Sequence, residues 1–85
     1  MNPQKGEIWK HFKHDPQGEE HNYTYEIIGV SLHTETQEMM VCYKPLYKSE
    51  FLEEKNADMF CRPLTMLSDL VEKENYQGPR FIRVI

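Results

Sequence analysis

The sequence predicts a mainly β protein, a small barrel or roll of about five strands with one short helix before the last strand. Its length of 85 residues suits one thin hydrophobic core, so we expect a single domain over residues 1–85. Its hydrophobic runs are short, rich in β-branched and aromatic residues, and separated by turn residues. Closure into a barrel would remove the exposed edges that an open sheet of this size retains.

The first two strands are predicted over residues 5–13 and 23–32. Residues 5–13 (KGEIWKHFK) alternate imperfectly between polar and apolar side chains, which is typical of a half-buried strand. Residues 14–22 (HDPQGEEHN) hold turn residues and no large apolar side chain, so they form a polar loop. Residues 23–32 (YTYEIIGVSL) give the strongest strand pattern, and Gly29 inside it indicates a bulge or sharp bend.

The next segments predict an antiparallel hairpin and a short fourth strand. A turn at 33–37, with a loop of about four to five residues, connects the second strand to a third at 38–43. Ser49 can cap a short helical turn that holds Phe51 and Leu52, while the acidic remainder up to residue 58 is expected to be an exposed loop. Residues 59–62 read as the fourth strand, which ends at a proline.

The predicted helix covers residues 66–73 and begins after Thr65, a good N-cap. Its apolar positions at i, i+1, i+4 and i+5 share one helical face, which we expect to cover an open end of the barrel. A turn at 77–79 then leads to a closing strand at 80–85. At this length an SH3-like roll is the natural candidate for such an order of elements.

The charge of the chain argues against general binding of duplex nucleic acid. The formal net charge is −4 and the isoelectric point is about 5.5, whereas phosphate-backbone binding needs a basic face. The charge is also uneven, being +2 over residues 1–14, −7 over residues 15–60 and +1 over residues 61–85. All three arginines lie in the last third, and arginine is the preferred partner of carboxylates and phosphates.

Two cysteines and the absence of long apolar runs point to the cytoplasm. No stretch resembles a signal peptide or approaches the length of about 20 apolar residues that spans a membrane. Cys42 and Cys61 are therefore expected to be reduced, with a structural disulfide as the minority alternative.

Six short motifs follow one another along nearly the whole chain. They are GEIWKHFK at 6–13, YEIIGV at 25–30, HTET at 33–36, VCY at 41–43 with LY at 46–47, RPL at 62–64 with Met66, and PRF at 79–81. In this order they resemble the motifs of the bacterial DUF1653 family, a domain of unknown function. The resemblance rests on the order of the motifs, since no single motif is specific.

The resemblance implies a small SH3-type β-roll and a bacterial source, and it implies no established activity. Two segments, 14–22 and 48–58, are longer than the family pattern. Phe12 stands where a tyrosine is usual, and Leu67 stands where a phenylalanine is usual. The longer loops leave open what lies beside His11 in space.

Our leading hypothesis is a binding module with a pocket for a small, planar, anionic, nucleotide-like molecule. Aromatic faces would stack the planar part, and arginines would hold the anionic part. No cofactor, metal site or catalytic residue is assigned. The candidate residues are Trp9, His11, Tyr25, Tyr43 and Arg62 in the pocket, with His33, Glu35 and Arg80 at its rim.

Each candidate also has a plainer interpretation. His33 and Glu35 suit hydrogen bonding within the turn, or general acid–base chemistry in a small hydrolase-like enzyme. Arg62 and Arg80 could pair with the excess acids, and the tyrosines could be half-buried sheet residues or a protein-interaction surface. His11 and His14 would diverge on a strand, which argues against a shared metal ion. The oligomeric state stays open.

Overall fold

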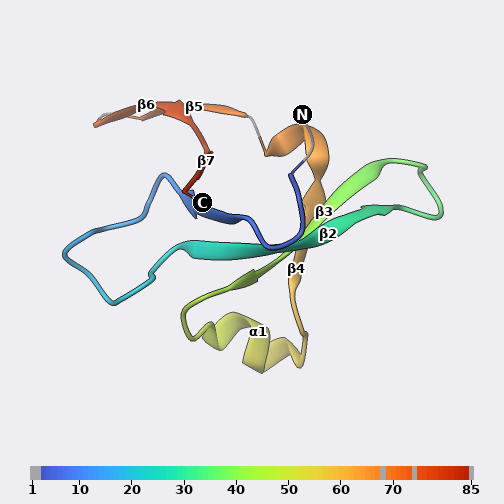
Figure 1. The fold of residues 1–85 in the computed structure, drawn as a ribbon, viewed down its shortest axis with the longest axis horizontal. Coiled ribbons are helices and arrows are strands. Elements are labelled where there is room, and N and C mark those ends of the chain that lie inside the picture. Colours follow the sequence, from blue (N-terminus) through green and yellow to red (C-terminus); the bar gives the residue numbers. More distant parts are fainter. Residues whose placement is uncertain (1–2, 68, 74, 85) are drawn as a thin grey trace.

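The structure, a computed structural model, describes residues 3–67, 69–73 and 75–84. It contains seven strands in these residues, one α-helix and one 3₁₀ turn (Figure 1). In chain order the elements are β1 (Ile8–His11), β2 (Thr24–Leu32), β3 (Met39–Pro45), α1 (Glu50–Lys55), β4 (Phe60–Pro63), η1 (Leu64–Met66), β5 (Leu70–Lys73), β6 (Tyr76–Pro79) and β7 (Phe81–Arg83). The predicted mainly β class is confirmed.

The β2–β3 hairpin lies at the centre of the molecule, and its two strands pair in antiparallel orientation. The register shifts between Ile27 and Gly29, so the bulge expected at this glycine is present. The backbone N–H of His33 donates to the carbonyl of Glu38 at 2.8 Å, which narrows the connection to residues 34–37. The predicted hairpin and its short loop are therefore confirmed.

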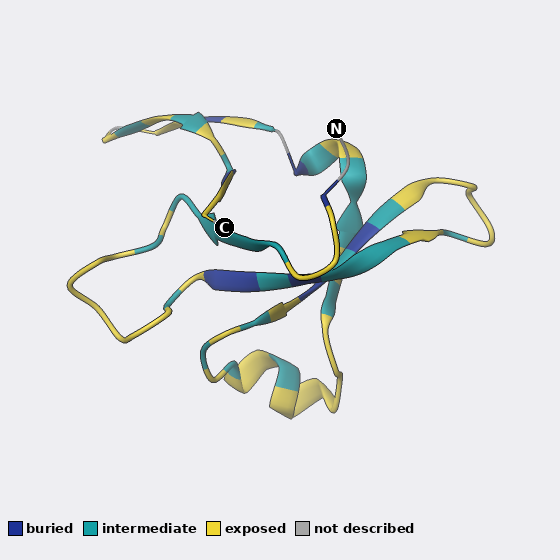
Figure 2. Ribbon diagram, viewed as in Figure 1, coloured by how far each residue is buried: buried dark blue, intermediate teal, exposed yellow. Residues whose placement is uncertain are grey.

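The core lies on one face of the five-stranded sheet, whose strand order is β4-β3-β2-β1-β7. Ile27 on β2 and Val41 on β3 are the large side chains with almost no exposure, at 1% and 0%. Buried residues follow β2 and β3 in Figure 2, whereas α1 is mostly exposed. The other members of the core cluster are Tyr25, Tyr43, Leu67 and Phe81.

Helix α1 begins where the sequence predicts a helical turn and continues further than expected. The hydroxyl of Ser49 accepts a hydrogen bond from the backbone N–H of Leu52 at 3.4 Å, as an N-cap does. The helix then includes the acidic residues up to Lys55, since Glu50 and Glu53 lie in its first turn and suit the positive end of the helix dipole. Asn56 ends it in the left-handed conformation, with φ of 55°.

The helix predicted over residues 66–73 is wrong. A 3₁₀ turn occupies Leu64–Met66, and Leu70–Lys73 is a strand paired with Tyr76–Pro79; Ser68 lies outside the described residues. Val71 is buried and Leu70 is 81% exposed, which is the alternation of a strand. An isolated helix of about two turns is unstable because it has too few internal hydrogen bonds. Residues 70–73 therefore pair with residues 76–79 as a strand.

The expected barrel does not close over the described residues. β4 and β7 are the two edges of the five-stranded sheet, and β5 and β6 pair only with each other in a second sheet. The two edge strands are short, with four residues in β4 and three in β7, and they do not pair with each other. The one α-helix also precedes β4 and not the last strand, and the closing strand covers only Phe81–Arg83 of the expected 80–85, with Ile85 outside the described part of the chain.

Candidate functional site

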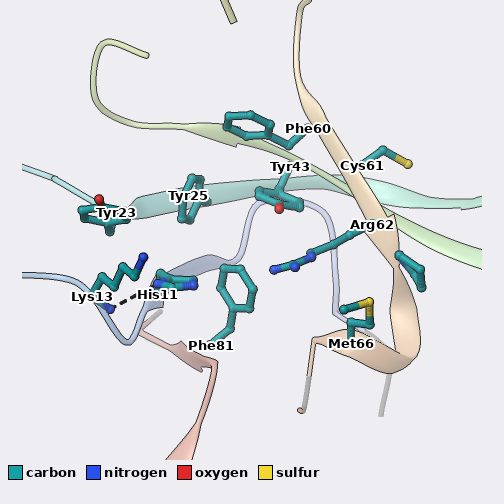
Figure 3. Close-up of a pocket in the computed structure, with 11 residues that line it drawn as sticks. His11, Lys13, Tyr23, Tyr25, Tyr43, Phe60, Cys61, Arg62, Met66 and Phe81 are labelled. Atoms are coloured by element: carbon teal, nitrogen blue, oxygen red, sulfur yellow. Dashed lines mark hydrogen bonds between the residues drawn. The ribbon is translucent and has the colours of Figure 1, made fainter. Parts of the chain in front are cut away.

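A pocket of about 480 Å³ lies on the core face of the five-stranded sheet (Figure 3). Its lining includes residues of five strands, β1, β2, β3, β4 and β7. Trp9 pairs with Tyr25, and His11 pairs with Phe81, in directly opposed positions. Opposed residues of antiparallel strands point to the same face. The lining residues are His11, Lys13, Tyr23, Tyr25, Tyr43, Phe60, Cys61, Arg62, Pro63, Met66 and Phe81.

The imidazole of His11 is held as a neutral ring. Burial, and then the charges of Arg80, Lys13 and Arg62, together lower the pKa of His11 to about 4. Its Nδ1 accepts a hydrogen bond from the backbone N–H of Lys13 at 3.2 Å, so the proton lies on Nε2. At neutral pH His11 is therefore a hydrogen-bond donor through Nε2 and carries no charge.

The guanidinium of Arg62 extends from β4 across the pocket, toward Tyr43 and Phe81 in Figure 3. Its central carbon lies 5.3 Å from the centroid of the Phe81 ring, which is cation–π distance. The expected ion pairs of Arg62 with acids are not formed with any described residue, and the ion pairs found in this part of the chain involve other cations. Arg62 thus lies against an aromatic ring and has no carboxylate partner among the described residues.

The tyrosines are mostly part of the core. Tyr25 and Tyr43 are 7% and 8% exposed, and their rings meet edge to face at 5.1 Å. Burial raises the pKa of both hydroxyls, and the hydroxyl of Tyr25 bonds to that of Tyr47 at 3.0 Å. Tyr23, at 40% exposure, is the lining tyrosine with an open ring.

The electrostatics of the lining differ from those of the chain. The lining holds Lys13 and Arg62 and no aspartate or glutamate, although the chain as a whole carries −4. Arg80 adds a third positive charge near His11, as its effect on the pKa of that imidazole requires. The pocket is consequently a local basic site within an acidic chain.

Two of the predicted rim residues lie in the β2–β3 turn and do not line the pocket. The Nδ1 of His33 accepts hydrogen bonds from the backbone N–H groups of Glu35 and Thr36 at 3.2 and 3.3 Å. Glu35 is exposed. Turn chemistry, the plainer interpretation of this pair, accounts for the side chain of His33, because its ring nitrogen accepts hydrogen bonds that close the turn, whereas Glu35 contributes its backbone N–H.

Trp9 and Arg80 lie close to the site without lining it. Trp9 packs against the core cluster, and its indole N–H donates to Oε1 of Glu7 at 3.1 Å. Arg80 places Nε at 4.0 Å from Oδ2 of Asp69, which is an ion-pair distance and too long for a hydrogen bond. The structure therefore brings together four of the eight candidates, namely His11, Tyr25, Tyr43 and Arg62.

Sequence reasoning missed several lining residues. Phe81 sits directly opposite His11, but that pairing joins the first and last strands and has no local signal in the sequence. Lys13 lies in a turn directly after β1, where the sequence predicts that the strand continues. Lys13, Tyr23, Phe60, Cys61, Pro63, Met66 and Phe81 complete the lining.

The two histidines at i and i+3 have separate environments. The Nδ1 of His14 lies 2.7 Å from the carbonyl oxygen of Asn22, within the 14–22 loop, whereas His11 faces the pocket. Nowhere in residues 3–67, 69–73 and 75–84 do three or more histidine, cysteine or acidic side chains gather as metal ligands.

The family model described as "Protein of unknown function (DUF1653)" matches residues 7–83. The match covers nearly all of the chain, so the chain belongs to this family. No curated protein and no solved structure matches it significantly. In the described part of the chain, no helix has the length and apolar character needed to cross a membrane.

Proposed function

We propose that this DUF1653 protein is a non-enzymatic binding module whose pocket takes a small planar molecule with an anionic group. The observation that carries the proposal is Arg62, a cation on the pocket wall with no carboxylate partner among the described residues. A partly desolvated cation is costly when unpaired, and an anionic ligand would supply the missing charge.

The shape and chemistry of the pocket support a small ligand. Its volume of about 480 Å³ falls within the range of small-molecule sites. The guanidinium of Arg62 lies over the Phe81 ring and meets no carboxylate among the described residues, so its N–H groups can offer two parallel hydrogen bonds to a phosphate or carboxylate. The Nε2–H of His11 would donate a hydrogen bond to the planar part of the ligand, and the exposed ring of Tyr23 would stack on it.

The test compares three probes by thermal shift and calorimetric titration. Adenosine 5′-monophosphate carries both a ring and an anion, whereas adenosine and inorganic phosphate each carry one of them. We expect the nucleotide to raise the melting temperature more than either part alone. A wider panel of mononucleotides and aromatic carboxylates follows, and no shift with any planar anion would contradict the proposal.

Two arginine variants separate binding from folding. Arg62→Ala should weaken binding of the active probe roughly 10- to 100-fold, the effect of losing a charged hydrogen-bond pair. Arg83→Ala removes the same charge from an exposed residue that pairs with Glu7 at 3.5 Å outside the lining, and it should bind normally. An equal loss of affinity in both variants would mean that the net charge of the protein, and not Arg62 itself, determines binding.

The proposal also includes an SH3-like fold and a location in the bacterial cytoplasm. The order β4-β3-β2-β1-β7, with a 3₁₀ turn after β4, supports an SH3-like roll that is left open at its edges. Free thiols at Cys42 and Cys61 support a reducing compartment, the bacterial cytoplasm.

A further inference from the structure

Two cysteines face each other across the β3–β4 pair. Cys42 and Cys61 are directly opposed in the register, and their sulfur atoms lie 3.7 Å apart. Both are free thiols, half-buried at Cys42 and exposed at Cys61. They alternate with Tyr43 and Arg62, so their sulfur atoms point to the opposite face of the sheet, as the Cys61 sulfur does in Figure 3. Cys61 is nevertheless one of the residues that line the pocket.

We propose that Cys42 and Cys61 are a reversible oxidation site, which a small-molecule disulfide such as glutathione disulfide converts into an intramolecular cross-strand disulfide. The inference is independent of the proposed ligand, because the thiols lie on the other face of the sheet.

The backbone already has the spacing that a disulfide needs. Directly opposed residues of antiparallel strands have Cα atoms about 4.5 or 5.5 Å apart, and both values fall within the disulfide range of about 4.4–6.8 Å. Pro63, which pairs with Met40, has no N–H to donate, so this pair suits a non-hydrogen-bonded position. Because the two kinds of pair alternate along the strands, the Cys42–Cys61 pair, two residues away, is also a non-hydrogen-bonded pair. The side chains of such pairs lie closest together.

Only the side chains must move for the bond to form. The sulfur separation must fall from 3.7 Å to about 2.05 Å, a change that rotation about the Cα–Cβ bonds can supply. The adjacent hydroxyl of Ser31 lies 3.4 Å from the sulfur of Cys42 and can donate to it when that thiol ionises.

The reaction is a two-step thiol–disulfide exchange. The exposed Cys61 thiolate attacks one sulfur of glutathione disulfide, forming a mixed disulfide and releasing one glutathione thiolate. The Cys42 thiolate then attacks the Cys61 sulfur and releases the second glutathione. Two thiols lose two electrons and two protons, and one glutathione disulfide becomes two glutathione molecules.

The surroundings of Cys61 determine how fast its thiol attacks glutathione disulfide. Burial, and then the contact with Cys42, raises the pKa of the Cys61 thiol. The thiolate is therefore scarce at neutral pH, and oxidation should accelerate as the pH rises.

The bond would join the edge strand to the centre of the sheet. β4 is an edge strand that carries Phe60 and Arg62, and the disulfide would close the segment that holds α1. Closing a segment of this length constrains the unfolded chain, so the melting temperature should rise by roughly 10 °C.

The experiment incubates the protein with glutathione disulfide and follows it by intact mass and non-reducing digestion. We expect monomer that has lost the mass of two hydrogen atoms, a cross-linked Cys42–Cys61 peptide, and reversal by dithiothreitol. A glutathione adduct that persists on Cys61, disulfide-linked dimers, or two unreacted thiols would each overturn the proposal.

Single-cysteine variants provide the matched control. In Cys42→Ser the mixed disulfide on Cys61 should accumulate, because no second thiol resolves it. In Cys61→Ser the half-buried Cys42 should react more slowly than Cys61 does in the other variant. Equal rates at both positions would contradict the assigned order of attack, and the wild-type mass measurement stands even if a variant folds poorly.

Discussion

At the residue scale, His11 links the pocket to the pH dependence of folding. Its pKa of about 4 in the folded protein lies below the ordinary value of 6.5, so the unfolded chain binds more protons between these values. The stability that His11 contributes is therefore complete above about pH 6.5 and is lost as the pH falls toward 4. Because the ring is only half-buried, solvent screening reduces the effect to roughly 1–2 kcal/mol.

Urea unfolding at pH 7 and pH 4.5 measures this contribution. His11→Phe keeps an aromatic ring beside Phe81 and removes the ionisable group, so the loss of stability on acidification should be smaller by roughly 1–2 kcal/mol. The exposed His21 provides the control, since His21→Gln should leave the acid dependence of the wild type unchanged. An acid dependence identical in His11→Phe and wild type would show that His11 titrates normally.

At this same scale, the sequence identifies candidate side chains better than it identifies their neighbours. Alternation along each strand places His11, Tyr25, Tyr43 and Arg62 on one face, and this is local information. That Phe81 lies under Arg62 at 5.3 Å depends on the pairing of the first and last strands, which no local pattern encodes. His33 and Glu35 were placed at the rim because residue type alone cannot tell a turn from a site.

At the element scale, the glycine of the β2 bulge tolerates a side chain better than its position suggests. A Cβ at Gly29 would meet no atom within 4 Å, and its φ lies outside the left-handed region. Gly29→Ala should therefore change the free energy of unfolding by less than about 0.5 kcal/mol, or raise it by up to about 1 kcal/mol by restricting the unfolded chain. Chemical denaturation measures both quantities.

Gly78 on β6 is the matched comparison. A Cβ there would lie 3.0 Å from the hydroxyl oxygen of Tyr76, which donates a hydrogen bond to the carbonyl of Pro79. Gly78 also has a φ of 156°, which L residues rarely adopt. Gly78→Ala should therefore strain the backbone as well as displace that hydroxyl, and destabilise the protein by roughly 1–3 kcal/mol. If Gly29→Ala were the more damaging of the two, the bulge would need glycine for a reason that its surroundings do not supply.

The one wrong element shows where local patterns fail. Thr65 and the apolar spacing that follows it satisfy the rules for a helix start, yet Leu70–Lys73 pairs with Tyr76–Pro79. The pattern of two helical turns is too short to distinguish a period of 3.6 from a period of 2. Ser49, in contrast, predicts the start of α1 correctly but not its full length, because a capping side chain acts within its own turn.

At the scale of the whole molecule, the open architecture gives an extended shape. The Cα radius of gyration is 13.3 Å, against about 12 Å for a compact chain of this length. The β5–β6 sheet and the β2–β3 turn both project from the central body (Figure 1). Sequence length predicts one thin core, but the failure of the edges to meet depends on the lengths of β4 and β7 and on where residues 70–79 pair.

The β5–β6 sheet should open before the five-stranded sheet does. Its strands pair only with each other, Val71 is its one buried side chain among the described residues, and Leu70 is 81% exposed. Few buried contacts mean a low free energy of local opening. In hydrogen exchange followed by NMR, its amides should exchange at least roughly tenfold faster than those of Ile27 and Val41.

A contact between the two sheets makes this prediction specific. Tyr76 on β6 stacks on Phe12 with ring centroids 5.3 Å apart, and the N–H of Arg80 donates to the carbonyl of Asp69 at 2.7 Å at the base of the hairpin. Phe12→Ala removes the stacking and leaves the hydrogen bond between Arg80 and Asp69 in place. Amide exchange should therefore become faster still in β5–β6 and change little in β2–β3. Equal acceleration in both sheets would mean that they open as one cooperative unit, and the small sheet would then be part of the core that supports the pocket.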